Sequence, residues 1–121
     1  MGVMEVRIDV SRFGADSFVV AVGGELDMHT VAPLREQLDA VLEDGARRLL
    51  VDLTGVTFIE STSLSALVAA ARTILSRRGR LVLVVDDACV RRAIQISGLD
   101  TFFRIESSLP EAVEALVGQR R

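Results

Sequence analysis

The sequence has few of the residues that link a chain covalently or bind a metal. It contains 1 cysteine and 1 histidine in 121 residues, so an internal disulfide is impossible and most zinc sites are excluded. A chain of this length buries roughly two-thirds of its unfolded surface and needs neither kind of support. We expect a single domain over residues 1–121 that holds no metal and no cofactor.

Long apolar runs and an excess of basic charge are missing as well. The longest stretch without a charged residue, residues 61–71, is far shorter than the 18 or more residues of a membrane span. The first residues alternate charged and apolar side chains, which is not typical of a secretory signal. A net charge of −3 gives no general attraction to nucleic acid or anionic lipid. We therefore expect a cytoplasmic protein that binds neither nucleic acid nor membrane.

Apolar patterns predict the strands. The first strand has apolar residues at every second position, the period of a half-buried strand. A polar turn that contains Gly14 and Asp16 leads to the next run, Phe18 to Val22, which ends at Gly23 and Gly24, so the two strands are predicted to form an antiparallel hairpin. Continuous apolar runs predict two strands buried on both faces. The alternating residues are Met4, Val6, Ile8 and Val10, the buried strands are predicted at 49–53 and 81–85, and a short last strand is predicted at 102–105.

Helical spacing of apolar residues predicts four helices between and after these strands. Caps and stops mark their ends: Asp86 is a predicted N-cap, and Ser108 with Glu111 forms a capping-box signature. The alternating order predicts an α/β fold with right-handed crossovers and one mixed, mostly parallel sheet of four to five strands. The helices are predicted at about 30–44, from 61 to a stop at Gly79, from 86 to about 97, and from 109 onward.

Polar residues gather after the strand predicted at 49–53. A loop over residues 54–60 leads to three consecutive hydroxyl residues, Ser61, Thr62 and Ser63, at the start of a helix. Ligands of α/β sheets bind at the carboxyl ends of the parallel strands, which is where these residues are predicted to lie. One hydroxyl residue is explained by helix capping, but three exceed what a cap requires.

Two motifs together resemble the STAS domain of bacterial anti-sigma factor antagonists, also called anti-anti-sigma factors. Gly24-Glu25-Leu26-Asp27, followed by Thr30, resembles the family's G-E-L-D element. Residues 50–64 resemble its strand, its loop and its D-S-[ST]-G-L signature, and residues 96–99 resemble the S-G-L end of its third helix. The motifs follow one another in the family's order over nearly the whole chain. The resemblance implies the STAS fold.

The resemblance also implies a non-enzymatic switch protein. In the family, an anti-sigma factor that is also a GHKL-type serine kinase phosphorylates the first hydroxyl residue after the acidic residue. On this chain that residue is Ser61, with Thr62 as the alternative. The unphosphorylated form binds the anti-sigma factor and frees a sigma factor, the phosphorylated form releases it, and a phosphatase resets the switch. The implied protein is a monomer or weak homodimer, and its implied partner-binding residues are Asp27, Met28, His29, Thr30, Glu60, Thr62, Ser63 and Leu64.

Two residues depart from the family's pattern. Glu60 stands where the family has aspartate, and Ser63 stands where it has glycine. Either change can retune partner choice or mark a constitutive, unphosphorylated adaptor subunit of a stress-signalling or transporter assembly. Asp27 and Thr30 are interpreted either as caps of the first helix or as partner contacts. A serine hydrolase is disfavoured, because the chain lacks a G-x-S-x-G elbow and His29 is its only histidine base.

Overall fold

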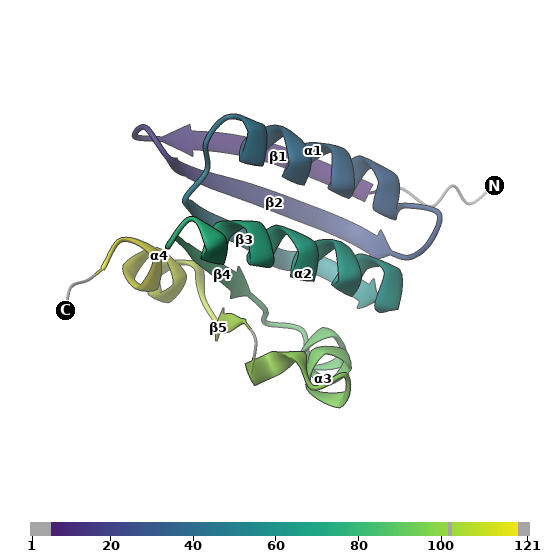
Figure 1. The fold of residues 1–121 in the computed structure, drawn as a ribbon. Helices are drawn as coiled ribbons and strands as arrows, with labels where there is room; N and C mark the ends of the chain where they lie inside the picture. The colour runs from purple at the N-terminus through teal and green to yellow at the C-terminus, as the bar shows by residue number, and fades with distance from the viewer. Residues whose placement is uncertain (1–5, 102, 119–121) are drawn as a thin grey trace.

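The strands of the computed structural model lie side by side in the order in which they follow one another along the chain (Figure 1). The structure describes residues 6–101 and 103–118. The first strand is antiparallel to the second, and every later neighbour is parallel, which confirms the predicted mixed, mostly parallel sheet. The five strands are β1 (Val6–Phe13), β2 (Ser17–Leu26), β3 (Arg48–Ile59), β4 (Arg80–Val84) and β5 (Arg104–Glu106).

Helices cover both faces of this sheet (Figure 1). Each parallel strand is added on the same side of the strand before it, so right-handed crossovers bring the three connecting helices to one face. The last helix follows the last strand and packs on the opposite face, against Leu50, Val82 and Val84. The helices are α1 (Val31–Glu43), α2 (Ser61–Ser76), α3 (Ala88–Ile96) and α4 (Leu109–Val117), with a short 3-10 helix, η1 (Leu99–Thr101), before β5.

Strand β3 lies at the centre of the sheet, and its apolar side chains form the middle of the hydrophobic core. Leu49, Leu50, Val51 and Leu53 are fully buried, because helices cover both faces of the sheet at this strand. The prediction of a strand buried on both faces is therefore confirmed. No helix in the described part of the chain is long and apolar enough to cross a membrane.

Strands β2 and β3 both run further than the sequence predicts. Gly23 and Gly24 do not end β2, and most of the predicted loop over residues 54–60 belongs to β3. The glycines let the two strands pair through this region, since Gly23 lies opposite Gly55 and a Cβ on Gly55 would stand 3.0 Å from the Gly23 Cα. Gly24 also adopts a positive φ of 107° beside a shift in register. As a result, Glu60 alone separates β3 from α2.

The outer strands and two helix ends differ from the predictions in smaller ways. In β1, Val6 and Ile8 pack against the core as expected, but Val10 is 40% exposed at the sheet edge. The N-cap of α3 is Asp87, not Asp86, and its carboxylate accepts hydrogen bonds from two backbone N–H groups. β5 begins at Arg104, later than predicted. Met4 and Phe102, which the strand predictions include, lie outside the described residues.

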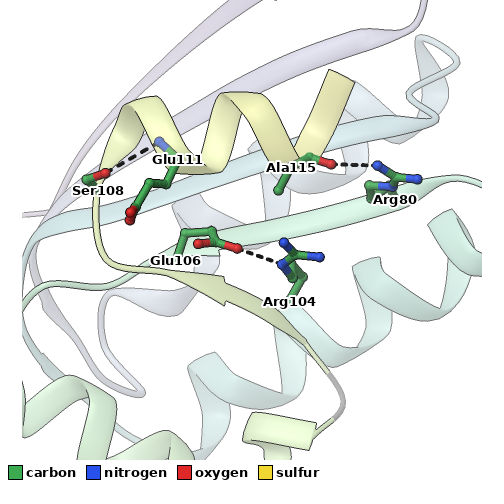
Figure 2. A network of polar contacts seen from close by, with 6 residues as sticks. All are labelled: Arg80, Arg104, Glu106, Ser108, Glu111 and Ala115. Atoms are coloured by element: carbon green, nitrogen blue, oxygen red, sulfur yellow. Dashed lines mark hydrogen bonds and ion pairs between the residues drawn. The ribbon is translucent and has the colours of Figure 1, made fainter. Parts of the chain in front are cut away.

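Polar contacts hold α4 on its face of the sheet (Figure 2). The Ser108 hydroxyl accepts a hydrogen bond from the Glu111 N–H at 3.4 Å, as predicted for the start of this helix. Arg80 of β4 donates to the Ala115 carbonyl oxygen at 2.6 Å. The contact fixes the last turn of α4 over the beginning of β4, so the helix covers the face of the sheet that the other helices leave open.

Candidate functional site

Glu60 joins the two motifs that the sequence singles out. Its backbone N–H donates to the Leu26 carbonyl oxygen at 3.1 Å, and its Oε2 atom accepts a hydrogen bond from the Met28 N–H at 3.1 Å. The turn between β3 and α2 is thereby fastened to the loop between β2 and α1. Residues more than thirty positions apart form one surface at the carboxyl ends of β2 and β3.

Asp27 and Thr30 shape the loop before α1. The Asp27 Oδ1 atom accepts hydrogen bonds from the N–H groups of His29 at 2.8 Å and Thr30 at 3.1 Å, and these bonds hold the pKa of the Asp27 carboxyl below its ordinary value. The Thr30 hydroxyl donates to the Glu25 carbonyl oxygen and accepts from the Asp27 N–H. Thr30 is the N-cap residue of α1, but its side chain makes no capping hydrogen bond to the helix. Both polar side chains therefore stabilise the loop itself.

Ser61 is the first residue of α2 and is exposed. The N–H groups of Ser63 and Leu64 donate to the Glu60 carbonyl oxygen at 3.0 and 3.1 Å. The N–H groups of Ser61 and Thr62 have no acceptor among the described residues, because the Glu60 side chain turns to Met28 instead of capping the helix. The positive end of α2 is consequently free beside the Ser61 side chain.

The hydroxyl groups of the next two residues are turned inward. The Thr62 Oγ1 and Ser63 Oγ atoms are buried and have no hydrogen-bond partner in the described part of the chain. This geometry favours Ser61 over Thr62 as a phosphate acceptor, because a kinase must reach the hydroxyl oxygen. Ser63 has no exposed surface at all.

The predicted partner-binding residues fall into three classes of exposure. The buried side chains support the surface from beneath, whereas the exposed and half-buried ones can be reached by a partner. Direct contact with a partner stays a prediction for the exposed and half-buried residues. Met28 and His29 are exposed, Asp27, Glu60 and Thr62 are half-buried, and Thr30, Ser63 and Leu64 are buried.

Phe58 is a further candidate that the sequence reasoning missed. Its side chain is 48% exposed near the end of β3, opposite Glu25 of β2. Met28, in the loop that Glu60 fastens to this edge, is 65% exposed. If the alternation of β3 is continued past Thr54, Phe58 falls on an outward-facing position. The residue was missed because residues 54–60 were predicted to form a loop. Phe58 stands two residues before Glu60, and the Met28 N–H is bonded to Glu60, so both residues lie close to the start of α2.

No metal-binding arrangement accompanies this surface. Among residues 6–101 and 103–118, no group of three or more histidine, cysteine, aspartate or glutamate side chains is placed to hold a metal ion. The surface presents a hydroxyl group, a carboxylate, free backbone N–H groups and exposed apolar side chains. These groups are suited to recognition and modification by another protein.

Replacing Ser63 by alanine is expected to stabilise the fold by about 1 kcal/mol, because it removes a buried hydroxyl group that lacks a partner. Thermal unfolding should show a rise in Tm of roughly 4 °C. Ser65→Ala is the matched control, since Ser65 is exposed on the same helix and its replacement gains only helix propensity. A Ser63→Ala variant that unfolds below the wild type would show that the hydroxyl makes a stabilising contact.

Comparisons with known proteins agree with the fold. The STAS domain family matches residues 7–112. The chain is 34% identical over 102 residues to the anti-sigma-F factor antagonist RsfB of Mycobacterium tuberculosis, covering 84% of this chain and 83% of that protein. A crystal structure of an anti-sigma factor antagonist from Mycobacterium paratuberculosis superimposes with a TM-score of 0.86 at 30% identity, covering 94% of this chain and 96% of the other. The unphosphorylated anti-sigma factor antagonist SpoIIAA shares the fold, with a TM-score of 0.79 at 21% identity over 95% of this chain and all of the other.

Proposed function

Because the chain belongs to the STAS domain family, we propose that it is an anti-sigma factor antagonist whose partner-binding surface surrounds Ser61. In this proposal the unphosphorylated protein binds an anti-sigma factor with GHKL-type serine kinase activity and so releases a sigma factor. The kinase phosphorylates Ser61, which ends the complex, and a phosphatase restores the starting state. The protein acts as a partner and a substrate and has no catalytic role of its own.

The observation that carries the proposal is the exposed Ser61 hydroxyl at the open N-terminus of α2. A phosphate there adds a charge of about −1.5 to −2. The free N–H groups of Ser61 and Thr62 favour an anion at this helix end by roughly 0.3 to 1 kcal/mol, so the fold should tolerate the modification. An interface that desolvates the same charge beside Glu60 is disfavoured by about 2 to 5 kcal/mol. Phosphorylation is therefore expected to change binding far more than folding.

Exposed apolar side chains supply the attractive part of the proposed interface. Met28 and Phe58 lie at the edge that carries Ser61, and His29 is exposed beside Met28. Burial of such side chains at the centre of an interface contributes much of its affinity. A phosphate at Ser61 would place a strongly hydrated charge next to these apolar contacts, which explains how one modification can control the complex.

Glu60 supports the switch through its backbone contacts as well as its charge. Its longer side chain reaches the Met28 N–H, so the loop that presents Met28 and His29 is held against the start of α2. We therefore interpret glutamate at this position as compatible with phosphorylation. The alternative function, a constitutive adaptor that is not phosphorylated, has no such observation in its favour, because Ser61 stays accessible.

Phosphosite mapping tests the proposal directly. Incubation with ATP and the anti-sigma factor kinase of the same organism should add one phosphate to the wild-type chain and none to Ser61→Ala. Thr62→Val should be phosphorylated like the wild type, because the Thr62 hydroxyl is buried.

Each other outcome of this experiment has a definite meaning. Phosphate on Ser61→Ala would move the acceptor elsewhere and contradict the assignment. A wild-type chain that binds the kinase tightly yet never accepts phosphate would overturn the switch in favour of the constitutive adaptor.

A further inference from the structure

Strand β1 forms the longer free edge of the sheet. It contains 8 residues and pairs only with β2, whereas β5 at the opposite edge contains 3 residues (Figure 1). The outer side of an edge strand carries backbone N–H and C=O groups that can pair with another strand. Natural edges are often blocked by proline, a bulge or charged side chains. The sequence VRIDVSRF has no proline, its pairing with β2 is regular, and its charged residues Arg7 and Asp9 are of opposite sign. This edge is therefore competent to accept a further strand.

The two faces of β1 carry different chemistry. Val6, Ile8 and Val10 lie on the face covered by α1, and Val10 is 40% exposed there. Arg7 and Asp9 lie on the opposite face, where both are exposed. Within the part of the chain that the structure describes, neither of these two charged side chains forms an ion pair. Apolar surface and unpaired charge thus occur together along one edge.

The sequence of β1 is complementary to itself. When two copies are placed antiparallel with Ile8 opposite Ile8, Val6 lies opposite Val10 on one face and Arg7 lies opposite Asp9 on the other. Cross-strand pairs of like apolar residues and of opposite charges stabilise antiparallel strands. A shift that places Arg7 or Asp9 opposite its own copy brings like charges together, which disfavours those two registers.

We propose that a second copy of this chain binds at β1, so that the two sheets join across a two-fold axis at Ile8. The contact is isologous, which means that each strand offers the same residues to the other. Because β2 and β3 separate β1 from α2, both Ser61 surfaces remain accessible in the pair. The proposal concerns only self-association, and it can fail or succeed independently of phosphorylation.

Charge reversal tests the pairing. Sedimentation velocity of the full chain should show a dimer that dissociates on dilution. Arg7→Glu replaces two attractive pairs by two repulsive ones and should raise the dimer Kd by about tenfold to thirtyfold. Adding Asp9→Arg to Arg7→Glu should restore the wild-type Kd. Arg72→Glu makes the same change of net charge at an exposed site on α2 and should leave the Kd unchanged.

Cysteine cross-linking tests the register. In a Cys89→Ser background, which removes the exposed natural thiol, Ile8→Cys should form an intermolecular disulfide, because opposite residues of antiparallel strands lie within disulfide reach. Val6→Cys is the matched control, since its two copies would lie about 13 Å apart along the strands.

Three results would contradict the proposed dimer. They are a wild-type chain that stays monomeric at all concentrations, an Arg7→Glu variant that dimerises like the wild type, and equal cross-linking through positions 6 and 8. Circular dichroism of each variant separates loss of pairing from loss of fold.

Discussion

Ser61→Asp is expected to fold like the wild type and to lose at least about thirtyfold in affinity for its anti-sigma factor. The new carboxylate stands at the free N-terminus of α2, where the unpaired N–H groups of Ser61 and Thr62 favour negative charge. In the proposed complex the same carboxylate would be desolvated beside Glu60. The change in binding should therefore exceed any change in the free energy of unfolding, as titration calorimetry and thermal unfolding would show.

A matched charge at the far end of the same helix isolates this effect. Ser76 is exposed at the last position of α2, roughly 20 Å from Ser61 by the rise of an α-helix. Ser76→Asp adds the same charge and should bind the anti-sigma factor like the wild type. Equal affinity of Ser61→Asp and the wild type would refute charge-controlled docking at Ser61. Equal losses in both aspartate variants would point to a general effect of net charge.

Gly79→Ala is expected to destabilise the fold by about 3 kcal/mol, the largest effect on stability that we predict for one added methyl group. A Cβ at this position would stand 2.0 Å from the Arg47 carbonyl oxygen, which also accepts the hydrogen bond that starts β4, from the Arg80 N–H at 2.8 Å. The three nearest atoms to this Cβ all belong to the backbone of Arg47, so no flexible side chain can move away. Thermal unfolding should show a Tm lowered by roughly 10 °C.

Gly14→Ala is the control for a purely conformational cost. Gly14 has a positive φ of 75° in the turn between β1 and β2, but nothing lies within 4 Å of its added Cβ. Its replacement should cost about 1 kcal/mol through backbone strain alone. If both variants lost equal stability, the contact between the added Cβ and the Arg47 carbonyl oxygen would not be the cause of the loss in Gly79→Ala.

Gly79 also shows where sequence reasoning named a residue correctly for an incomplete reason. The pattern predicts only that the helix stops at Gly79. In the structure, Arg78 adopts the left-handed conformation after the helix, with φ of 60°, while Gly79 is needed because the backbone of Arg47, just before β3, passes close by. The spacing of a glycine in the chain does not reveal which distant backbone will approach it.

The sequence by itself determined the order of the elements, the α/β class and the position of Ser61 at the start of a helix. These features depend on the local period of apolar residues and on short motifs, which one stretch of chain contains completely. A continuous apolar run predicted the burial of β3 on both faces, because such a run leaves no polar side to face water.

Only the tertiary structure decided how the site is assembled. The contact between Glu60 and Met28, the inward turn of the Thr62 and Ser63 hydroxyl groups and the exposure of Phe58 all depend on segments that are distant in sequence. The strands continue through Gly23 and Gly55 because the two glycines lie opposite each other and let the backbones of β2 and β3 approach closely. Pairing between strands and packing across the sheet are long-range, so local patterns could predict the acceptor serine but not the surface that surrounds it.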